Sequence, residues 1–436
     1  MKVFKYTLLC WLVLLGSCCF AAETNSPISA PLPNPLTMRN GTPVTSKEQW
    51  FHDRRPELKS MFQFFMYGSM PPNPGQTNFV VERVYKNFFD GKATKKEVTI
   101  SFSSDTNSPK ITLLVITPNH PPKKASQRLS GNIGTGSEQL IARAPHDARY
   151  PIFLGINFNG NDTLLTDTTT ALPNGWVSKN RRGSVNHEAN EKGRGSQVDM
   201  WAIEQTIDRG YAFASFYCGD VEPDDPNATT GIRTWLNLKN ETGALAAWAW
   251  GVSRAVDYLV TDRNIDPKRI AVVGHSRLGK AALLAGAFDD RIALTIPLQA
   301  GCGGSAPSRG TIGESVKAIT KEFPHWFNDE FKKYADQPEA LPFDQNCLVA
   351  MCAPRPVLFA AAAEDTWANP AGQFEVLRAA SPVFFFTGGE GLAAKQMPET
   401  NHLISSQLGY YIRPGKHSMT KDDWKFFLDY ADKQMR

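Results

Sequence analysis

Residues 269–287 have the sequence RIAVVGHSRLGKAALLAGA, and this stretch decides the fold. The apolar run that ends at Gly274 predicts a buried strand, and Leu278–Phe288 consists mostly of good helix formers. Ser276 lies in the turn between them, where Gly274 and Gly279 remove the Cβ atoms that would collide as strand and helix close around the serine. This order of strand, turn and helix is that of a nucleophile elbow, written here as G-x-S-x-x-G instead of the commoner G-x-S-x-G.

The elbow predicts a serine nucleophile. It lifts the Ser276 hydroxyl above the sheet and directs backbone N–H groups at the helix start toward a developing oxyanion. We expect the N–H of Arg277 to be one such donor and its guanidinium a second, charged one, because an arginine in a first turn otherwise opposes the helix dipole. His275 precedes the serine, so its side chain should point away from the pocket. The alternative is a serine N-cap after a buried strand, with no catalytic role.

The general base should follow the nucleophile, since the triad of this fold runs in the order serine, acid, histidine. His402 and His417 are the candidates. His417 lies in RPGKHSMT, between the last predicted strand and the C-terminal helix, whereas His402 precedes that strand. We therefore assign the base to His417, with a surface loop histidine as the alternative for either position.

The acid orients the base and stabilises its imidazolium form. The loop after the predicted strand Ile292–Leu298 offers Gln299, which is not a carboxylate. The loop after Pro356–Ala361 offers Glu364 and Asp365. We assign the acid to Asp365, and a solvated acidic pair in a loop is the alternative.

Strand-like and helix-like segments alternate from about residue 97 onward. The predicted strands are Val98–Phe102, Ile111–Thr117, Ile152–Phe158, Tyr211–Phe216, Arg269–Gly274, Ile292–Leu298, Pro356–Ala361, Pro382–Thr387 and Tyr410–Arg413. The predicted helices are Val198–Arg209, Ala244–Leu259, Leu278–Phe288 and Lys421–Lys433. Such alternation predicts the α/β class, with a mostly parallel central sheet flanked by helices on both faces, as in the three-layer sandwich of the α/β-hydrolases.

Composition excludes several classes of protein. The chain has 436 residues, of which 47 are Lys or Arg and 43 are Asp or Glu, so the net charge is +4. A polybasic nucleic-acid binder and an acidic disordered tail are therefore excluded. Hydrophobic residues make up 42% of the chain, which is enough for a sizeable core. With 30 Pro and 33 Gly, a loop-rich fold is expected and a compact helical bundle is not.

The N-terminus predicts export. Residues 1–22 combine two lysines, an apolar run and small residues, as in a secretory signal peptide, and they are too short to span a membrane. The protein is thus expected to be secreted or periplasmic; a lipid anchor at Cys18, on the outer membrane, is the alternative. Residues 23–45 are Pro-rich and predict a linker or a wrapped arm, and 46–436 a single esterase domain. Within it, 119–150 is polar and predicts a surface insertion near the active face.

The cysteines outside the predicted leader leave their pairing open. In an oxidising compartment they can form bridges, and free buried thiols are an equal alternative. These four residues are Cys218, Cys302, Cys347 and Cys352. None has the spacing of zinc ligands, and we expect no metal or organic cofactor.

Six further motifs carry a resemblance to a known family. They are GHSRLGK (274–280), DRIALTIPLQAGCGG (290–304), GES (313–315), FPHWF (323–327), LPFDQ (341–345) and EDTWANP (364–370). By these motifs the chain resembles the glucuronoyl esterases, carbohydrate esterase family 15, of bacterial type. The resemblance implies an α/β-hydrolase that cleaves the ester between glucuronic or 4-O-methyl-glucuronic acid of xylan and lignin alcohols.

The resemblance also implies residue roles. It gives the catalytic roles already assigned to Ser276 and His417, and makes Arg277 the oxyanion stabiliser. Lys280 and Glu314 match positions that bind sugar hydroxyls, which an ammonium and a carboxylate can satisfy together as donor and acceptor. Trp367 matches an indole that contacts the uronoyl group, and a flat apolar face with an N–H suits a pyranose.

Two departures from the fungal pattern concern the catalytic centre. Fungal members carry a cysteine bridge at the positions of His275 and Ser418, and their acid lies at the position of Gln299. Some bacterial members have the acid after the next strand, where this chain has Asp365. Two other functions stay open: a broader carbohydrate carboxylesterase, such as an acetyl-xylan esterase, and a non-catalytic glycan-binding relative. We expect a monomer.

Overall fold

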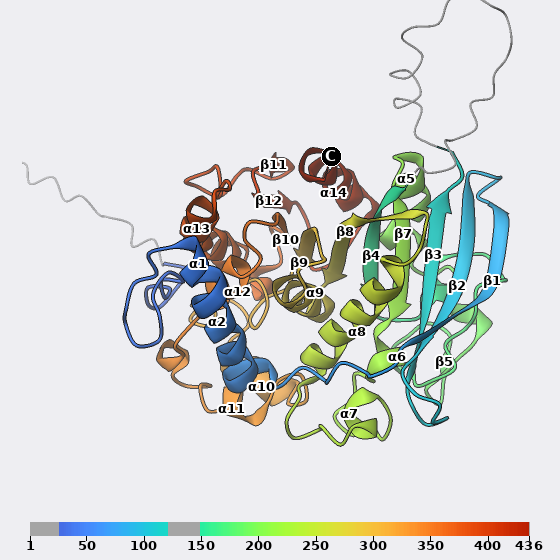
Figure 1. Cartoon of the computed structure of the whole chain (residues 1–436), viewed down its shortest axis with the longest axis horizontal. Coiled ribbons are helices and arrows are strands. Elements are labelled where there is room, and N and C mark those ends of the chain that lie inside the picture. Colours follow the sequence, from blue (N-terminus) through green and yellow to red (C-terminus); the bar gives the residue numbers. More distant parts are fainter. Residues whose placement is uncertain (1–25, 121–148, 436) are drawn as a thin grey trace, which may run out of the picture.

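The computed structural model describes residues 26–120 and 149–435. Within them, ten strands form one sheet in the order β1-β2-β3-β7-β4-β8-β9-β10-β12-β11 (Figure 1). Its strands are β1 (Asn78–Phe88), β2 (Ala93–Ser101), β3 (Lys110–Pro118), β4 (Tyr150–Asn157), β7 (Ala212–Tyr217), β8 (Ile265–His275), β9 (Leu294–Leu298), β10 (Val357–Ala362), β11 (His402–Ile404) and β12 (Leu408–Arg413). From β7 to β12 the neighbours are parallel, and β1, β2, β3 and β11 are antiparallel.

Helices cover both faces of this sheet. One face is packed by α8 (Ala244–Leu259), α9 (Arg277–Phe288), α12 (Gln345–Ala350) and α13 (Pro370–Thr387), and the other by α4 (Val198–Trp201), α5 (Ile203–Asp208) and α14 (Lys421–Gln434). Alternate residues of β4 pack into the hydrophobic cores on the two faces of the sheet. Ile152 and Leu154 lie in the core on the first face, and Phe153 lies in the core on the second. Strands buried on both faces are typical of parallel sheets. The expected α/β-hydrolase sandwich is confirmed.

Short elements complete the described chain. The short helices and turns are α1 (Lys47–Gln49), η1 (Trp50–Arg54), α2 (Arg55–Phe62), η2 (Gln63–Tyr67), η3 (Asn161–Leu164), η4 (Glu191–Gly193), α6 (Cys218–Val221), α7 (Ile232–Trp235), α10 (Val316–Glu322), α11 (Asp329–Lys332), η5 (Pro338–Ala340) and η6 (Thr366–Ala368). A two-stranded hairpin is formed by β5 (Ser184–Val185) and β6 (Glu188–Ala189). Most of these elements lie in the long loops that surround the carboxyl ends of the parallel strands.

Eight of the nine predicted strands are confirmed, and one is wrong. Pro382–Thr387 forms the end of α13, not a strand. Asn369 caps the N-terminus of this helix, where its side chain accepts a hydrogen bond from the N–H of Gly372 at 2.8 Å. Gly388, with φ 94°, caps the C-terminus. Capping residues at both ends thus stabilise the helix, although its last turns consist of an aromatic run whose composition is typical of a strand. The helix tolerates Pro382 at the cost of one backbone hydrogen bond.

The predicted helices are confirmed with one break. Val198–Arg209 divides into α4 and α5 at Ala202, which has φ 42°. The helical segments over residues 47–67 and the edge strand β1 were not predicted. The strand β1 is exposed along most of its length, so it lacks the alternation of apolar and polar residues that identifies a half-buried strand.

Residues 26–45 lie as an arm against the rest of the molecule. The N–H of Ser29 donates to the carbonyl of Arg309 at 2.8 Å. Farther along, Arg54 Nε donates to the carbonyl of Pro35 at 2.9 Å, and Asn346 Nδ2 to that of Pro33 at 2.8 Å. Backbone carbonyls of the Pro-rich segment thus serve as acceptors for buried side chains of the domain.

The predicted insertion is attached far from the elbow. Tyr150, which begins β4, pairs with Ile265 at the start of β8, whereas Ser276 follows the other end of β8. The described residues that flank the insertion therefore lie at the edge of the sheet opposite the nucleophile, whereas the position of the insertion near the active face stays a prediction. Most of the insertion and the predicted leader with Cys18 lie outside the described residues.

The four cysteines are buried free thiols, which answers the question of their pairing for the described chain. Burial raises the pKa of Cys347 and of Cys352 to about 11, and that of Cys218 and Cys302 further. They are thus packed as small apolar groups. Among the described helices, none combines the length and the apolar character needed to cross a membrane.

Candidate active site

The turn after β8 has the strained geometry of the predicted elbow. Ser276 adopts φ 57° and ψ −129°, in a region that a residue with a side chain rarely occupies. A Cβ atom on Gly274 would lie 2.1 Å from the carbonyl oxygen of Leu278, and one on Gly279 would lie 2.9 Å from the carbonyl oxygen of Gly274. The expectation that both glycines are required by close approach of strand and helix is confirmed.

The first turn of α9 offers backbone donors beside the serine. The carbonyl of Ser276 accepts the first helical hydrogen bond, from Lys280 N at 3.1 Å, and the N–H of Ser276 donates to Leu298 in β9 at 2.9 Å. The N–H of Arg277, at the first helical position, has no acceptor in the described part of the chain. Free N–H groups and the helix dipole make this point a favourable place for a negative oxygen.

An imidazole and a carboxylate pair next to the elbow. His417 Nδ1 lies 2.7 Å from Asp365 Oδ2, and the carboxylate is 2% exposed while the ring is 40% exposed. Asp365 follows β10 and His417 follows β12, two strands that are neighbours in the sheet. The ring of His417 lies 4.6 Å, centre to centre, from that of His275, the residue before Ser276. Three loops thus bring the predicted serine, histidine and acid into one region.

The competing residues have other surroundings. Glu364 is exposed. Within residues 26–120 and 149–435 its side chain makes no hydrogen bond, and its backbone N–H donates to the carbonyl of Gly415 at 3.0 Å. Gln299 does not bond His417; its Oε1 accepts from the N–H of Ser418 at 2.9 Å and lies 3.2 Å from His275 Nε2. His402 lies exposed in the edge strand β11. Geometry therefore favours Asp365 over both Glu364 and Gln299 as the partner of the base.

His275 is a neutral donor in this network. Burial, followed by the electrostatic interaction with the neighbouring His417, lowers the pKa of His275 to about 3. Because the Ser418 N–H must donate to Gln299 Oε1, this oxygen can only accept, and the His275 proton lies on Nε2. His275 and Ser418 thus share one acceptor, Gln299 Oε1.

The Arg277 side chain packs against other residues of the site and does not extend freely into solvent. Its Nε lies 2.5 Å from Asp224 Oδ2, and its guanidinium lies 4.7 Å from the centre of the Phe158 ring and 5.6 Å from that of Trp326. The side chain keeps 31% of its surface exposed. Sequence reasoning found Arg277 but missed these three neighbours. Trp326 belongs to the FPHWF motif, whereas no pattern in the sequence marks Asp224 or Phe158.

Lys280 is bound by the protein itself. Its ammonium donates to the carbonyl of Ala300 at 2.7 Å, to that of Cys302 at 2.6 Å and to Glu314 Oε2 at 2.8 Å. An ammonium has three N–H donors, so all are used, and the side chain is buried. Lys280 thus fixes the Glu314 carboxylate, and the sugar-binding roles of both residues stay predictions.

Trp367 and Glu314 are neighbours through their backbones. The N–H of Glu314 donates to the carbonyl of Trp367 at 2.8 Å, and Trp367 is 52% exposed. Trp367 lies in η6, two residues after Asp365. Trp367 thus offers an exposed, flat apolar surface with an N–H close in sequence to Asp365, and the backbone of Glu314 is joined to the same turn.

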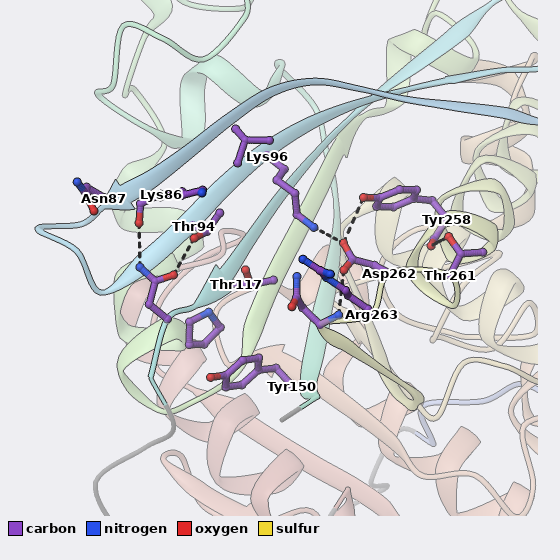
Figure 2. Close-up of a pocket in the computed structure, with 14 residues that line it drawn as sticks. Lys86, Asn87, Thr94, Lys96, Thr117, Tyr150, Tyr258, Thr261, Asp262 and Arg263 are labelled. Carbon is purple, nitrogen blue, oxygen red and sulfur yellow. Dashed lines mark hydrogen bonds and ion pairs between the residues drawn. The ribbon is translucent and has the colours of Figure 1, made fainter. Parts of the chain in front are cut away.

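A cavity elsewhere in the molecule lacks this chemistry. It has a volume of about 750 Å³ and lies between β1, β2 and β3 and the starts of β4 and β8, at the edge of the sheet opposite Ser276 (Figure 2). Asp262 is paired there with Lys96 and accepts from the Tyr258 hydroxyl at 3.2 Å. Neither serine nor histidine is among the described residues that line it.

Comparisons with known proteins identify the family of the chain. A family model described as glucuronyl esterase of fungi matches residues 189–388. The carbohydrate esterase MZ0003 of an unknown prokaryotic organism is 41% identical over 413 residues, or 93% of this chain and 89% of that protein. A promiscuous CE15 esterase from a marine bacterial metagenome superposes with TM-score 0.83 at 40% identity, over 94% of this chain and 98% of its own. The glucuronoyl esterase from Solibacter usitatus gives TM-score 0.83 at 35% identity, over 95% and 100%.

These similarities span the described chain, not the elbow alone. The related structures cover both the sheet and the loops around its carboxyl ends, where the serine, the histidine and the acid lie. The resemblance first carried by six short motifs is thereby confirmed, and the alternative of a non-catalytic glycan-binding relative is excluded. The chain belongs to carbohydrate esterase family 15, the glucuronoyl esterases, and is an esterase.

Proposed function

We propose that this esterase hydrolyses esters of glucuronic or 4-O-methyl-glucuronic acid, such as those that join glucuronoxylan to lignin, through a serine acyl-enzyme. One observation carries the proposal: the His417–Asp365 pair, at 2.7 Å, lies beside the strained serine turn in a chain of this family. No metal or organic cofactor has a role in this mechanism.

The reaction begins when Ser276 Oγ attacks the carbonyl carbon of the uronoyl ester. His417 Nε2 removes the hydroxyl proton, and Asp365 holds the opposite ring nitrogen and stabilises the imidazolium. The negative oxygen of the tetrahedral intermediate is bound by the N–H of Arg277 and by its guanidinium. The intermediate collapses as His417 returns the proton to the leaving alcohol. Water then attacks the uronoyl-serine ester with the same base, which releases the acid and the free serine.

The sugar is recognised beside the reacting carbon. The exposed Trp367 stacks on a face of the pyranose, and Glu314 accepts hydrogen bonds from its hydroxyls. Lys280 supports this by fixing the Glu314 carboxylate and the loop at Ala300. The leader of residues 1–22 exports the enzyme to the compartment where plant cell-wall glycans are found.

The test compares two substrates in two proteins. Wild type should hydrolyse benzyl glucuronate, and Ser276→Ala should have no activity above background while its thermal unfolding is nearly unchanged, because only one hydroxyl is lost. Turnover of benzyl glucuronate by Ser276→Ala near the wild-type rate would refute the nucleophile. An equal kcat/KM on aryl acetate and on benzyl glucuronate in wild type would refute the specificity for the uronoyl group.

A second candidate function is broader ester hydrolysis by the same triad. One relative favours this function, because the marine metagenome esterase is a promiscuous esterase. A small acyl pocket needs neither the Trp367 platform nor the Glu314 carboxylate. Glu314→Ala should therefore weaken hydrolysis of glucuronate esters much more than that of aryl acetate. Equal losses on both substrates would favour the broader function.

A further inference from the structure

We propose that Asp224 is a positioning residue that holds the Arg277 guanidinium in the orientation needed to bind the oxyanion. The proposal rests on the oxyanion role of Arg277 in the proposed function. Asp224 lies in the loop after α6, more than fifty positions before the nucleophile. It belongs to none of the motifs that predicted the site.

Two hydrogen-bond donors and one ion-pair partner, from two distant segments, converge on this carboxylate. Arg277 Nε lies 2.5 Å from Oδ2, while Oδ1 lies 2.9 Å from His325 Nε2 and 2.7 Å from Trp326 Nε1. The carboxylate is 15% exposed. Burial acts to raise the pKa of Asp224. The hydrogen bond from His325 and the positive charge of Arg277 outweigh this effect and keep the pKa below its usual range. Asp224 is thus an anion with a filled set of partners.

Asp224 pairs with the Nε side of the guanidinium and accepts no hydrogen bond from its two Nη groups. Asp224 contacts Nε, and Nη1 and Nη2 donate no hydrogen bond to the described part of the chain. The side chain keeps 31% of its surface exposed, and Arg277 directly follows Ser276 in the elbow. The two Nη groups can therefore meet an oxygen that the substrate brings.

Two aromatic rings restrict the remaining freedom of the arginine. The guanidinium lies over Phe158 and near Trp326, within the range of cation–π contacts. Trp326 serves twice, because its indole N–H donates to Asp224 while its ring contacts Arg277. An exposed arginine would otherwise lose much conformational freedom in the transition state, and a donor fixed in advance avoids that loss.

The first test is Asp224→Asn, which keeps the size of the side chain. An amide is uncharged and has one acceptor oxygen, and its NH₂ group would face donors. It therefore cannot both pair with Arg277 and accept from His325 and Trp326. On benzyl glucuronate we expect kcat to fall ~10–100-fold and KM to change less than ~3-fold, the pattern for a lost transition-state contact. Trp326→Phe keeps an aromatic side chain but removes the indole N–H, and should show a smaller loss in kcat.

The matched control is Asp225→Asn. It removes the same charge from the next residue, whose carboxylate accepts only from the N–H of Asn227, at 2.9 Å, in the described chain. Its kcat should equal that of wild type. Equal losses in Asp224→Asn and Asp225→Asn would mean that the charge of this loop, not the contact with Arg277, is responsible, and would overturn the proposal.

A double-mutant cycle with Arg277→Ala separates positioning from a structural role. If Asp224 acts through Arg277, Asp224→Asn should cause no further loss in kcat in the Arg277→Ala protein. Losses that multiply would overturn the proposal, as would a higher kcat in Asp224→Asn, which would mean that Asp224 holds the arginine away. If Asp224→Asn does not fold, the same cycle is run with Trp326→Phe, and the same outcomes decide.

The proposed function can fail separately. A kcat near wild type in Arg277→Ala alone would refute the oxyanion role of the arginine and, with it, the role of Asp224. A large loss in Arg277→Ala together with full activity in Asp224→Asn would overturn the positioning role alone.

Discussion

Glu364 and Asp365 are adjacent acids with opposite environments. The Asp365 carboxylate is buried against His417, whereas Glu364 is exposed. Asp365→Asn keeps the size but removes the charge that stabilises imidazolium, so kcat on benzyl glucuronate should fall by ~10²–10⁴-fold. Glu364→Gln, the matched control, should stay within a few-fold of wild type. The assignment fails if the glutamine variant is inactive while the asparagine variant is active.

Lys280 illustrates a residue whose role changes once its partners are known. It forms a buried ion pair with Glu314, with side chains 4% and 7% exposed. Lys280→Met leaves that carboxylate and two carbonyls without their donor, and should lower the free energy of unfolding by ~3–5 kcal/mol. Lys317→Met breaks an exposed pair with Asp336 and should have no measurable effect.

Chemical denaturation measures both Lys variants. If Lys280 only contacted the sugar, Lys280→Met would raise KM and leave the unfolding free energy unchanged. That result would restore the role implied by the family resemblance.

The sequence predicted the residues of the site whose chemistry has a local pattern. Ser276 has its two glycines, and His417 its place between the last strand and helix. Asp224 could not be found in this way, because its meaning depends on Arg277, which the fold brings to it. The partners of Lys280 were missed for the same reason: they lie in the loop after β9.

At the scale of the element, the elbow makes a quantitative prediction. A Cβ atom at position 274 would lie 2.1 Å from a backbone carbonyl oxygen, which cannot move without displacing α9. Gly274→Ala should therefore lower the free energy of unfolding by ~3 kcal/mol or more and reduce kcat, since the serine turn must shift. Gly175→Ala is the control, because nothing lies within 4 Å of its Cβ position. Equal stability of the two variants would contradict the close packing.

The element scale also shows where sequence patterns fail. The parallel strands were predicted because each is an apolar run buried on both faces. The same composition misled at Pro382–Thr387, where the caps at Asn369 and Gly388 and the buried face of α13 decide for a helix. Composition describes burial, whereas the type of element here depends on the termini. For the edge strand β1, neither the composition nor the termini indicate the type of element.

For the whole molecule, pH dependence of stability follows from Asp220. Burial raises the pKa of Asp220 to about 7, against the hydrogen bond that its carboxylate accepts from Thr112 N at 2.9 Å. The folded protein then binds a proton that the unfolded chain releases near pH 4, so this group's contribution to stability is present below pH ~4 and is lost as the pH rises to ~7.

Asp220→Asn isolates that effect, because the amide oxygen still accepts from Thr112 and does not titrate. We expect the Tm of Asp220→Asn minus that of wild type to be larger at pH 8 than at pH 4.5, measured by scanning calorimetry. A difference that is the same at both pH values, or larger at pH 4.5, would contradict the raised pKa.

The overall order of the strands lay beyond sequence analysis. Alternation predicted a parallel sheet, but not that β7 lies between β3 and β4, because strand order depends on contacts between distant residues. It is this order that brings the loops after β8, β10 and β12 to one edge, so that Ser276, Asp365 and His417 meet.

The central claim is that Ser276 is a nucleophile activated within this cluster of loops. Its most direct test is labelling with a fluorophosphonate, followed by peptide mass spectrometry. The account predicts one adduct, on Ser276, which is slowed by methyl glucuronate and absent from the His417→Ala protein. An adduct on another residue, or labelling at the wild-type rate in His417→Ala, would contradict it.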